Sequence, residues 1–195
     1  MPIELHAFSW ERMIQAVEKV QARTLRATGV LKSANIPCAV AGGNAVAAWV
    51  ARVDRAAVRN TQDVDILIRR SDFQAAKEAL ESSDFFYQVI FGEDCFLDQP
   101  DQNPRGAAHL LFAGEKVKPD DLLPNAEITE REPAEQYDIL QLESLVRMKL
   151  NTHRLKDRVH LLDMISIGLV DESWLPRFPQ PPADRLQQLI DNPDA

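Results

Sequence analysis

Two short segments, residues 39–45 and 61–68, place the strongest constraint on how this chain folds. The first is an apolar run that ends at Gly42-Gly43, and the second opens with Asp63 and Asp65 before an apolar run. Side chains alternate across a strand, so both carboxylates are expected on one side and Val64 on the other. Two adjacent carboxylates repel each other unless a positive charge lies between them. Mg²⁺ prefers oxygen ligands, and we therefore expect Asp63 and Asp65 to bind this ion.

The two glycines predict a tight turn between a strand and a helix over residues 45–53. Glycine lets a ligand approach the backbone closely. The free N–H groups at the start of a helix suit phosphate oxygens. The backbone of Gly42 and Gly43 is therefore a candidate phosphate cradle.

These motifs together resemble the nucleotidyltransferase fold superfamily, in particular the minimal nucleotidyltransferases and the nucleotidyltransferases of toxin–antitoxin pairs. The family pattern is Gly-Gly or Gly-Ser, then Asp-x-Asp, then a third carboxylate on a later strand. The resemblance covers roughly residues 35–167. It implies an α/β (α+β) fold, with a mixed β-sheet flanked by helices and a helical C-terminal segment. Asn44 would join the phosphate cradle, at a position where relatives often have Ser or Thr.

The rest of the chain is expected to follow that frame. Residues 1–34 would contain a packing helix, residues 35–132 the core, and residues 133–195 the helical segment with its proline-rich tail. Hydrophobic periodicity and turn signals predict these boundaries. Further expected elements are a helix at 8–34 capped by Ser9, strands at 85–91, 95–98 and 107–112, an edge strand at 126–130, and an exposed loop at 99–105.

The third carboxylate of the family pattern is missing from its expected position, which His109 occupies. A neutral imidazole can bind a metal or accept a proton, but Mg²⁺ favours carboxylate and water. His109 is thus either the third site residue or a histidine packed on an apolar strand. A third possibility is that Asp98, Asp101 or Glu115 supplies the charge.

A second motif lies in residues 142–167, where apolar residues at helical spacing indicate two helices. Lys149 on the first is expected to reach the cleft and contact the β- and γ-phosphates. Asp157 and Asp163 are expected to orient basic side chains. This lysine, basic stretch and paired aspartates resemble the helical part of the toxin-type nucleotidyltransferases.

The resemblance implies Mg²⁺-dependent transfer of a nucleoside monophosphate from a nucleoside triphosphate to a hydroxyl, with an RNA or protein acceptor. Asp63, Asp65 and His109 would be catalytic, and Gly42, Gly43, Asn44 and Lys149 would bind the nucleotide. The alternative is a catalytically weakened module that binds nucleotide or a protein partner, as an antitoxin or regulator would. Another carboxylate within metal range of Asp63 and Asp65 would favour the enzyme. A His109 that faces the core, with no acid in its place, would favour the binding module.

Composition limits the possible functions. The net charge of −8 argues against binding nucleic acid broadly through phosphate neutralisation, although a small nucleotide remains compatible. The two cysteines exclude a disulfide scaffold and fit a reducing cytoplasm. No apolar stretch is long enough for a membrane span, and no signal peptide is expected at the N-terminus.

Overall fold

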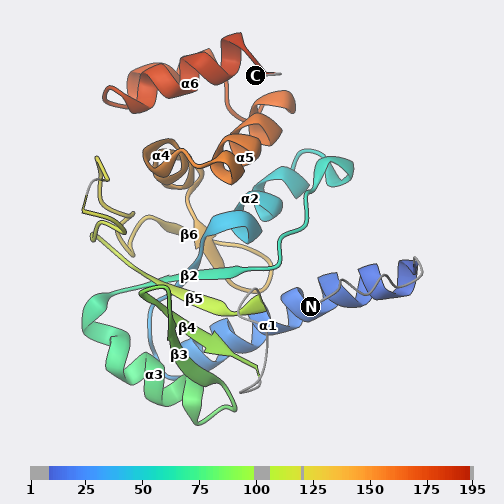
Figure 1. Cartoon of the computed structure of the whole chain (residues 1–195), viewed down its shortest axis with the longest axis vertical. Helices are drawn as coiled ribbons and strands as arrows, with labels where there is room; N and C mark the ends of the chain where they lie inside the picture. The colour runs from blue at the N-terminus through green and yellow to red at the C-terminus, as the bar shows by residue number, and fades with distance from the viewer. Residues whose placement is uncertain (1–8, 99–105, 120, 194–195) are drawn as a thin grey trace, which may run out of the picture.

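The computed structural model describes residues 9–98, 106–119 and 121–193. Within these residues one seven-stranded sheet has the order β3-β4-β5-β2-β1-β7-β6. Helices α1 (Trp10–Ser33) and α3 (Phe73–Glu81) cover one face of the sheet (Figure 1). Helices α2 (Gly42–Ala51), α4 (Leu142–Thr152), α5 (Leu155–Ser166) and α6 (Pro182–Asp191) lie on the other side. The mixed α+β architecture expected from the sequence is confirmed.

Strand β2 (Val64–Ile68) lies in the middle of the sheet and shows the predicted alternation. Val64, Ile66 and Ile68 pack into the core beneath α1 and α3, whereas Leu67 packs into the core on the α2 side. Asp65 lies between Val64 and Ile66 in the strand, so it shares the α2 face with Leu67. The strand therefore directs Asp65 toward the helices that contain the second motif.

The neighbours of β2 fix its register. Strand β1 (Ala39–Val40) pairs with it antiparallel, and β5 (Ala108–Phe112) pairs with it parallel, with Asp65 opposite His109. Strands β3 (Phe86–Ile90) and β4 (Glu93–Leu97) form the expected hairpin, and β4 places Cys95 opposite His109.

The edge strand predicted at residues 126–130 is not found there, so this prediction is wrong. Residues 126–130 form no β-strand. The strand at this edge of the sheet is β6 (Arg131–Pro133), which pairs with β7 (Asp138–Leu140). Ala126 and Ile128 look like strand residues because they are buried in the core near α4 and α6. The predicted loop at 99–105 lies outside the described residues.

Several local expectations hold. The Ser9 hydroxyl accepts a hydrogen bond from the Arg12 N–H and so caps α1. Helix α2 differs from the expectation: it begins at Gly42, with Ala41 as its N-cap, and ends at Ala51. Helix α6 follows the 3₁₀ segment Glu172–Arg177. None of the helices in the described residues is long and apolar enough to cross a membrane.

The β3–β4 hairpin turns through Phe91 and Gly92, whose φ angles are 53° and 84°. A two-residue turn with both φ values positive is type I′, which prefers Asn-Gly. Phe91 is fully exposed, so it gains nothing from burial. We predict that Phe91→Asn stabilises the fold by about 1 kcal/mol, measured by urea denaturation. Gly92→Ala should instead destabilise it, and equal effects of the two changes would contradict this account of the turn.

Candidate active site

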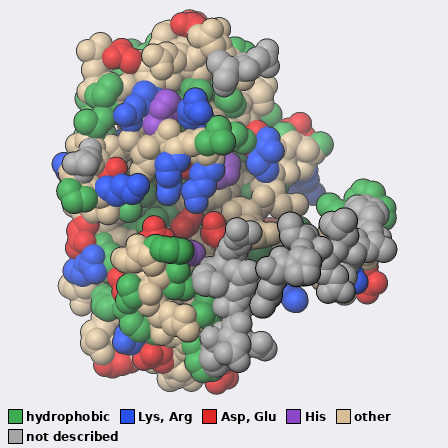
Figure 2. All heavy atoms as spheres, in the orientation of Figure 1, with side chains coloured by type: hydrophobic (Ala, Val, Ile, Leu, Met, Phe, Trp, Pro, Cys, Tyr) green, Lys and Arg blue, Asp and Glu red, His purple; other side chains and the backbone are tan. Residues whose placement is uncertain are grey.

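A cavity of about 370 Å³ lies between the sheet and the α4–α5 helices. Three of its acidic side chains lie on the sheet side: Asp65 in β2, Asp63 directly before β2, and Glu93 in β4. Its basic side chains opposite them include Lys149, Arg154 and Lys156. In this orientation the surface shows a band of Lys and Arg above a group of Asp and Glu across the middle of the molecule (Figure 2). The predicted carboxylates and Lys149 are thus brought to one cavity.

The diglycine turn forms part of this cavity through Gly42, whose φ is +59°. A Cβ atom placed on Gly42 would lie 1.7 Å from the Asp65 Oδ2, so only glycine leaves room for this carboxylate. A Cβ on Gly43 would meet Thr61 at 2.9 Å. The two glycines therefore allow α2 to begin directly against the strand that carries Asp65.

Two hydrogen bonds fasten the turn to β2. The Ala41 N–H donates to the Asp65 carbonyl oxygen at 2.8 Å. The Asn44 side-chain amide donates to the Asp63 carbonyl oxygen at 2.8 Å. Asn44 thus holds the segment that presents Asp63, in addition to its expected place beside the phosphate cradle.

The Asp65 carboxylate is surrounded by protein, and this burial raises its pKa. His109, Lys156 and Lys149 oppose the rise through their positive charge, while Asp63 adds to it. A cation between the two carboxylates would stabilise the charged form of Asp65 in the same way.

His109 faces the cavity and is not sealed in the core. Its Nδ1 lies 3.3 Å from the Glu93 Oε2 and 3.2 Å from the Cys95 Sγ. Cys95 is buried, which raises the pKa of its thiol to about 11, so this sulfur is a thiol at neutral pH. The imidazole of His109 at the cavity wall therefore has a carboxylate and a thiol beside its Nδ1.

The other acids considered from the sequence are engaged elsewhere. Asp98 accepts hydrogen bonds from Arg23 at 2.7 Å and from Arg26 at 2.6 Å. Glu115 pairs with Arg70 at 2.7 Å. Asp101 lies outside the described residues.

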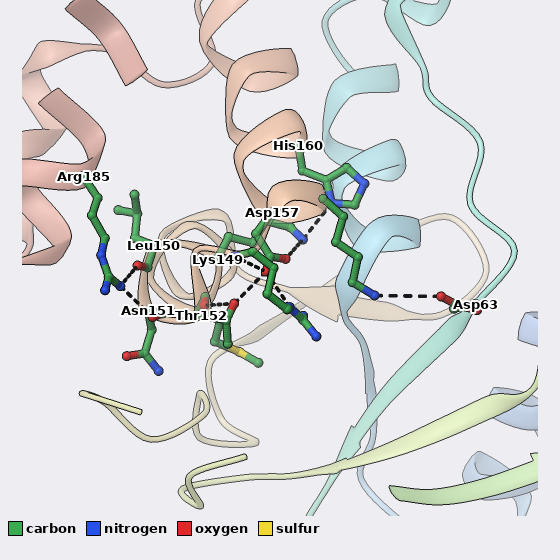
Figure 3. A network of polar contacts seen from close by, with 11 residues as sticks. Asp63, Lys149, Leu150, Asn151, Thr152, Asp157, His160 and Arg185 are labelled. Atoms are coloured by element: carbon green, nitrogen blue, oxygen red, sulfur yellow. Dashed lines mark hydrogen bonds and ion pairs between the residues drawn. The ribbon is translucent and has the colours of Figure 1, made fainter. Parts of the chain in front are cut away.

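Lys149 is buried at the contact between α4 and α5 (Figure 3). Its Nζ donates to the His160 Nδ1 at 2.9 Å and lies 3.4 Å from the Asp157 Oδ1. Because the ammonium group is a donor, Nδ1 of His160 must accept and its proton must be on Nε2. Burial, and then the charge of Lys149, lower the pKa of His160 to about 4, so the imidazole is neutral at pH 7.

Asp157 organises this cluster, as the sequence analysis expected. Burial acts to raise its pKa, but hydrogen bonding by Arg154 and the charge of Lys149 bring the pKa below its ordinary value. Its Oδ2 accepts hydrogen bonds from the Thr152 hydroxyl and the Arg154 Nε, both at 2.8 Å. Asp163 likewise holds Arg59 at 2.8 Å. Both aspartates orient basic side chains.

The C-terminal end of α4 is held from a distant part of the chain. Arg185 of α6 donates to the carbonyl oxygens of Leu150 and Asn151 at 2.6 and 2.7 Å. These carbonyls lie in the last turn, where a helix lacks internal partners. The contact steadies the helix that carries Lys149.

The chemistry of the donor set fits Mg²⁺. In the described residues no group of three or more His, Cys, Asp and Glu is arranged to hold a metal ion. Mg²⁺ does not need such a cage, because it is commonly bound by one or two carboxylates together with substrate phosphates and water. Asp63 and Asp65 offer hard oxygen ligands at the cavity wall, and the missing Cβ of Gly42 leaves the space that the Asp65 carboxylate occupies.

Sequence reasoning missed Glu93 and the specific role of Lys156. Glu93 looked like part of an ordinary turn because only the β4–β5 pairing brings it to His109. Lys156 lies in the expected basic stretch, yet its Nζ is 3.9 Å from the Asp63 Oδ2, a long-range contact that sequence spacing does not reveal.

We predict that Gly42→Ala destabilises the fold by at least about 2 kcal/mol, since it adds left-handed strain and a clash with Asp65. Gly29→Ala is the matched control: Gly29 lies within α1 with open space around its Cβ position. That change should stabilise the fold by about 0.5–1 kcal/mol. Chemical denaturation compares the two, and a tolerated Gly42→Ala would contradict the close approach.

The lowered pKa of His160 predicts a pH dependence of stability. The unfolded chain takes up a proton near pH 6.5 and the folded one only near pH 4, so stability falls as pH falls through this window. The loss is at most about 3 kcal/mol. His160→Gln keeps an acceptor for Lys149 and removes the titration, so it should flatten the profile between pH 6.5 and 4. Identical slopes in the variant and the natural protein would refute this.

The sequence matches no protein-family model, and no curated protein matches it significantly. Solved structures do match. An antigenic nucleotidyltransferase-like protein from Paracoccidioides brasiliensis aligns with a TM-score of 0.53 at 20% identity, over 90% of this chain and 86% of that one. JHP933 from Helicobacter pylori aligns with a TM-score of 0.50 at 14% identity, over 96% and 78% of the two chains. With the diglycine turn and Asp-x-Asp strand arranged as described, this chain has the nucleotidyltransferase-like fold.

Proposed function

We propose that the protein transfers a nucleoside monophosphate from a nucleoside triphosphate to a hydroxyl group. The observation that carries this proposal is the cavity with two opposed walls, with Asp63 and Asp65 on the sheet and Lys149 and Lys156 across from them. A metal–triphosphate complex has the complementary charges, with the cation for the carboxylates and phosphate oxygens for the lysines. The nucleotidyltransferase-like fold supports the same reading.

The reaction joins the acceptor oxygen to the α-phosphorus and breaks the bond from that phosphorus to the bridging oxygen of the β-phosphate. Pyrophosphate leaves with the bonding electrons, and the acceptor hydroxyl gives up its proton. Mg²⁺ held by Asp63 and Asp65 would neutralise phosphate charge and make the hydroxyl more acidic. Lys149 offsets the charge that develops on pyrophosphate, and the N-terminus of α2 at Gly42 and Gly43 faces the phosphates.

In this scheme His109 is the general base that takes the proton from the acceptor hydroxyl. With a proton on Nδ1 directed at Glu93, the lone pair of the imidazole is on Nε2 and can accept the proton of the hydroxyl. This arrangement substitutes for the third carboxylate. The acceptor is proposed to be an RNA or a protein, as in toxin–antitoxin pairs, and the compartment to be the cytoplasm.

The second candidate is a binding module that holds a nucleotide or a protein partner without turnover, as an antitoxin-like regulator would. It is favoured by His109, which stands where the family pattern has a carboxylate. Release of pyrophosphate separates the two candidates, because a binding module would protect the nucleotide and leave it intact.

We predict that a nucleoside triphosphate raises the melting temperature only with Mg²⁺, and that Asp65→Asn abolishes this shift. At a ligand concentration of about 100 times Kd, the stabilisation is about 2.7 kcal/mol, which is measurable by thermal shift with each of the four nucleotides. Asp191→Asn is the control, since Asp191 lies at the end of α6 and contacts Gln187. If none of the four nucleotides shifts the melting temperature, the result would count against both the transferase and a nucleotide-binding module.

A further inference from the structure

Lys156 differs from the other cations on the helical side of the cavity. Lys149 is buried and bound by Asp157 and His160, and Arg154 is held by Asp157. The Lys156 side chain is 54% exposed, and its ion-pair partner is Asp63, on the sheet side of the cavity. It therefore connects the basic wall directly to a site carboxylate.

This ammonium group lies where the two neighbouring carboxylates require a positive charge. Its Nζ is 3.9 Å from the Asp63 Oδ2. A divalent cation at Asp63 and Asp65 would meet the same need. The ammonium and the cation would repel each other, so both cannot remain against Asp63.

We propose that Lys156 exchanges partners during binding. Before ligand binds, its ammonium group lies beside Asp63, and when the metal–nucleotide complex binds, it turns to the phosphate oxygens. This inference rests on the proposed function and assigns to Lys156 two successive partners.

The energetics favour such an exchange. An exposed ion pair at this separation is weak, and the long lysine side chain is free to reorient. Hydrogen bonds from an ammonium group to phosphate are among the stronger polar contacts. Lys149 lacks this freedom because it is buried between two partners. The Lys156 side chain can therefore reorient toward the phosphates when the triphosphate binds.

The exchange predicts opposite effects of one substitution on two ligands. Lys156→Gln should bind Mn²⁺ alone about threefold more tightly, because a competing positive charge is gone. It should bind the α,β-methylene analogue of the preferred nucleoside triphosphate with Mg²⁺ about tenfold more weakly, because a charged phosphate contact is lost. Isothermal titration calorimetry measures both affinities, and neither measurement requires turnover or a known acceptor.

Arg158→Gln is the matched control, since it removes one positive charge from the same helix at a residue that does not line the cavity. Both affinities should stay near those of the natural protein. If Lys156→Gln weakens both ligands, or changes neither, the exchange is refuted while the proposed function stands. If the natural protein binds neither Mn²⁺ nor any of the four analogues, the proposed function fails as well.

Discussion

The approach of the Asp65 carboxylate to the backbone of Gly42 is the contact on which the site depends. It requires a residue without a Cβ atom at a positive φ, at the point where α2 begins. It also requires β2 to direct Asp65 to the α2 face of the sheet, which the packing of Val64 and Ile66 on the opposite face enforces. The register of β2 therefore determines both the core packing and the position of the carboxylate. A slip of one residue would turn Asp65 into the core under α1 and α3 and turn its apolar neighbours to the α2 face.

The helical side of the cavity is organised around buried charge. Lys149 and Asp157 lie in low-dielectric surroundings, where an unpaired charge is costly and a satisfied pair is rigid. The neutral imidazole of His160 and the hydroxyl of Thr152 complete their hydrogen bonding. This fixed cluster presents one cation at a defined place, while the exposed Lys156 remains adaptable. The site thus combines a rigid cation with a mobile one on the wall opposite the carboxylates.

Much of this architecture could be predicted from local sequence. Alternation in β2, the capped helix α1 and the β3–β4 hairpin all follow from short-range patterns, and each was found. The sequence patterns failed where contacts between distant parts of the chain determine the local structure or complete the site. Ala126 and Ile128 are buried in a hydrophobic cluster, yet their segment forms no strand. Glu93 reaches His109 only through the pairing of β4 with β5, and no spacing rule connects residues that meet in this way. The fold was therefore more predictable than the completion of its site.

The proposed reaction requires Asp63 and Asp65 to hold a divalent cation beside the diglycine turn. Crystals grown with Mn²⁺ and an α,β-methylene nucleotide analogue would test it directly, because anomalous scattering locates the manganese. We expect a manganese peak within bonding distance of carboxylate oxygens of both aspartates, with the triphosphate between Gly42 and Lys149. An ordered analogue whose manganese lies away from these carboxylates, or a peak at neither aspartate, would contradict it.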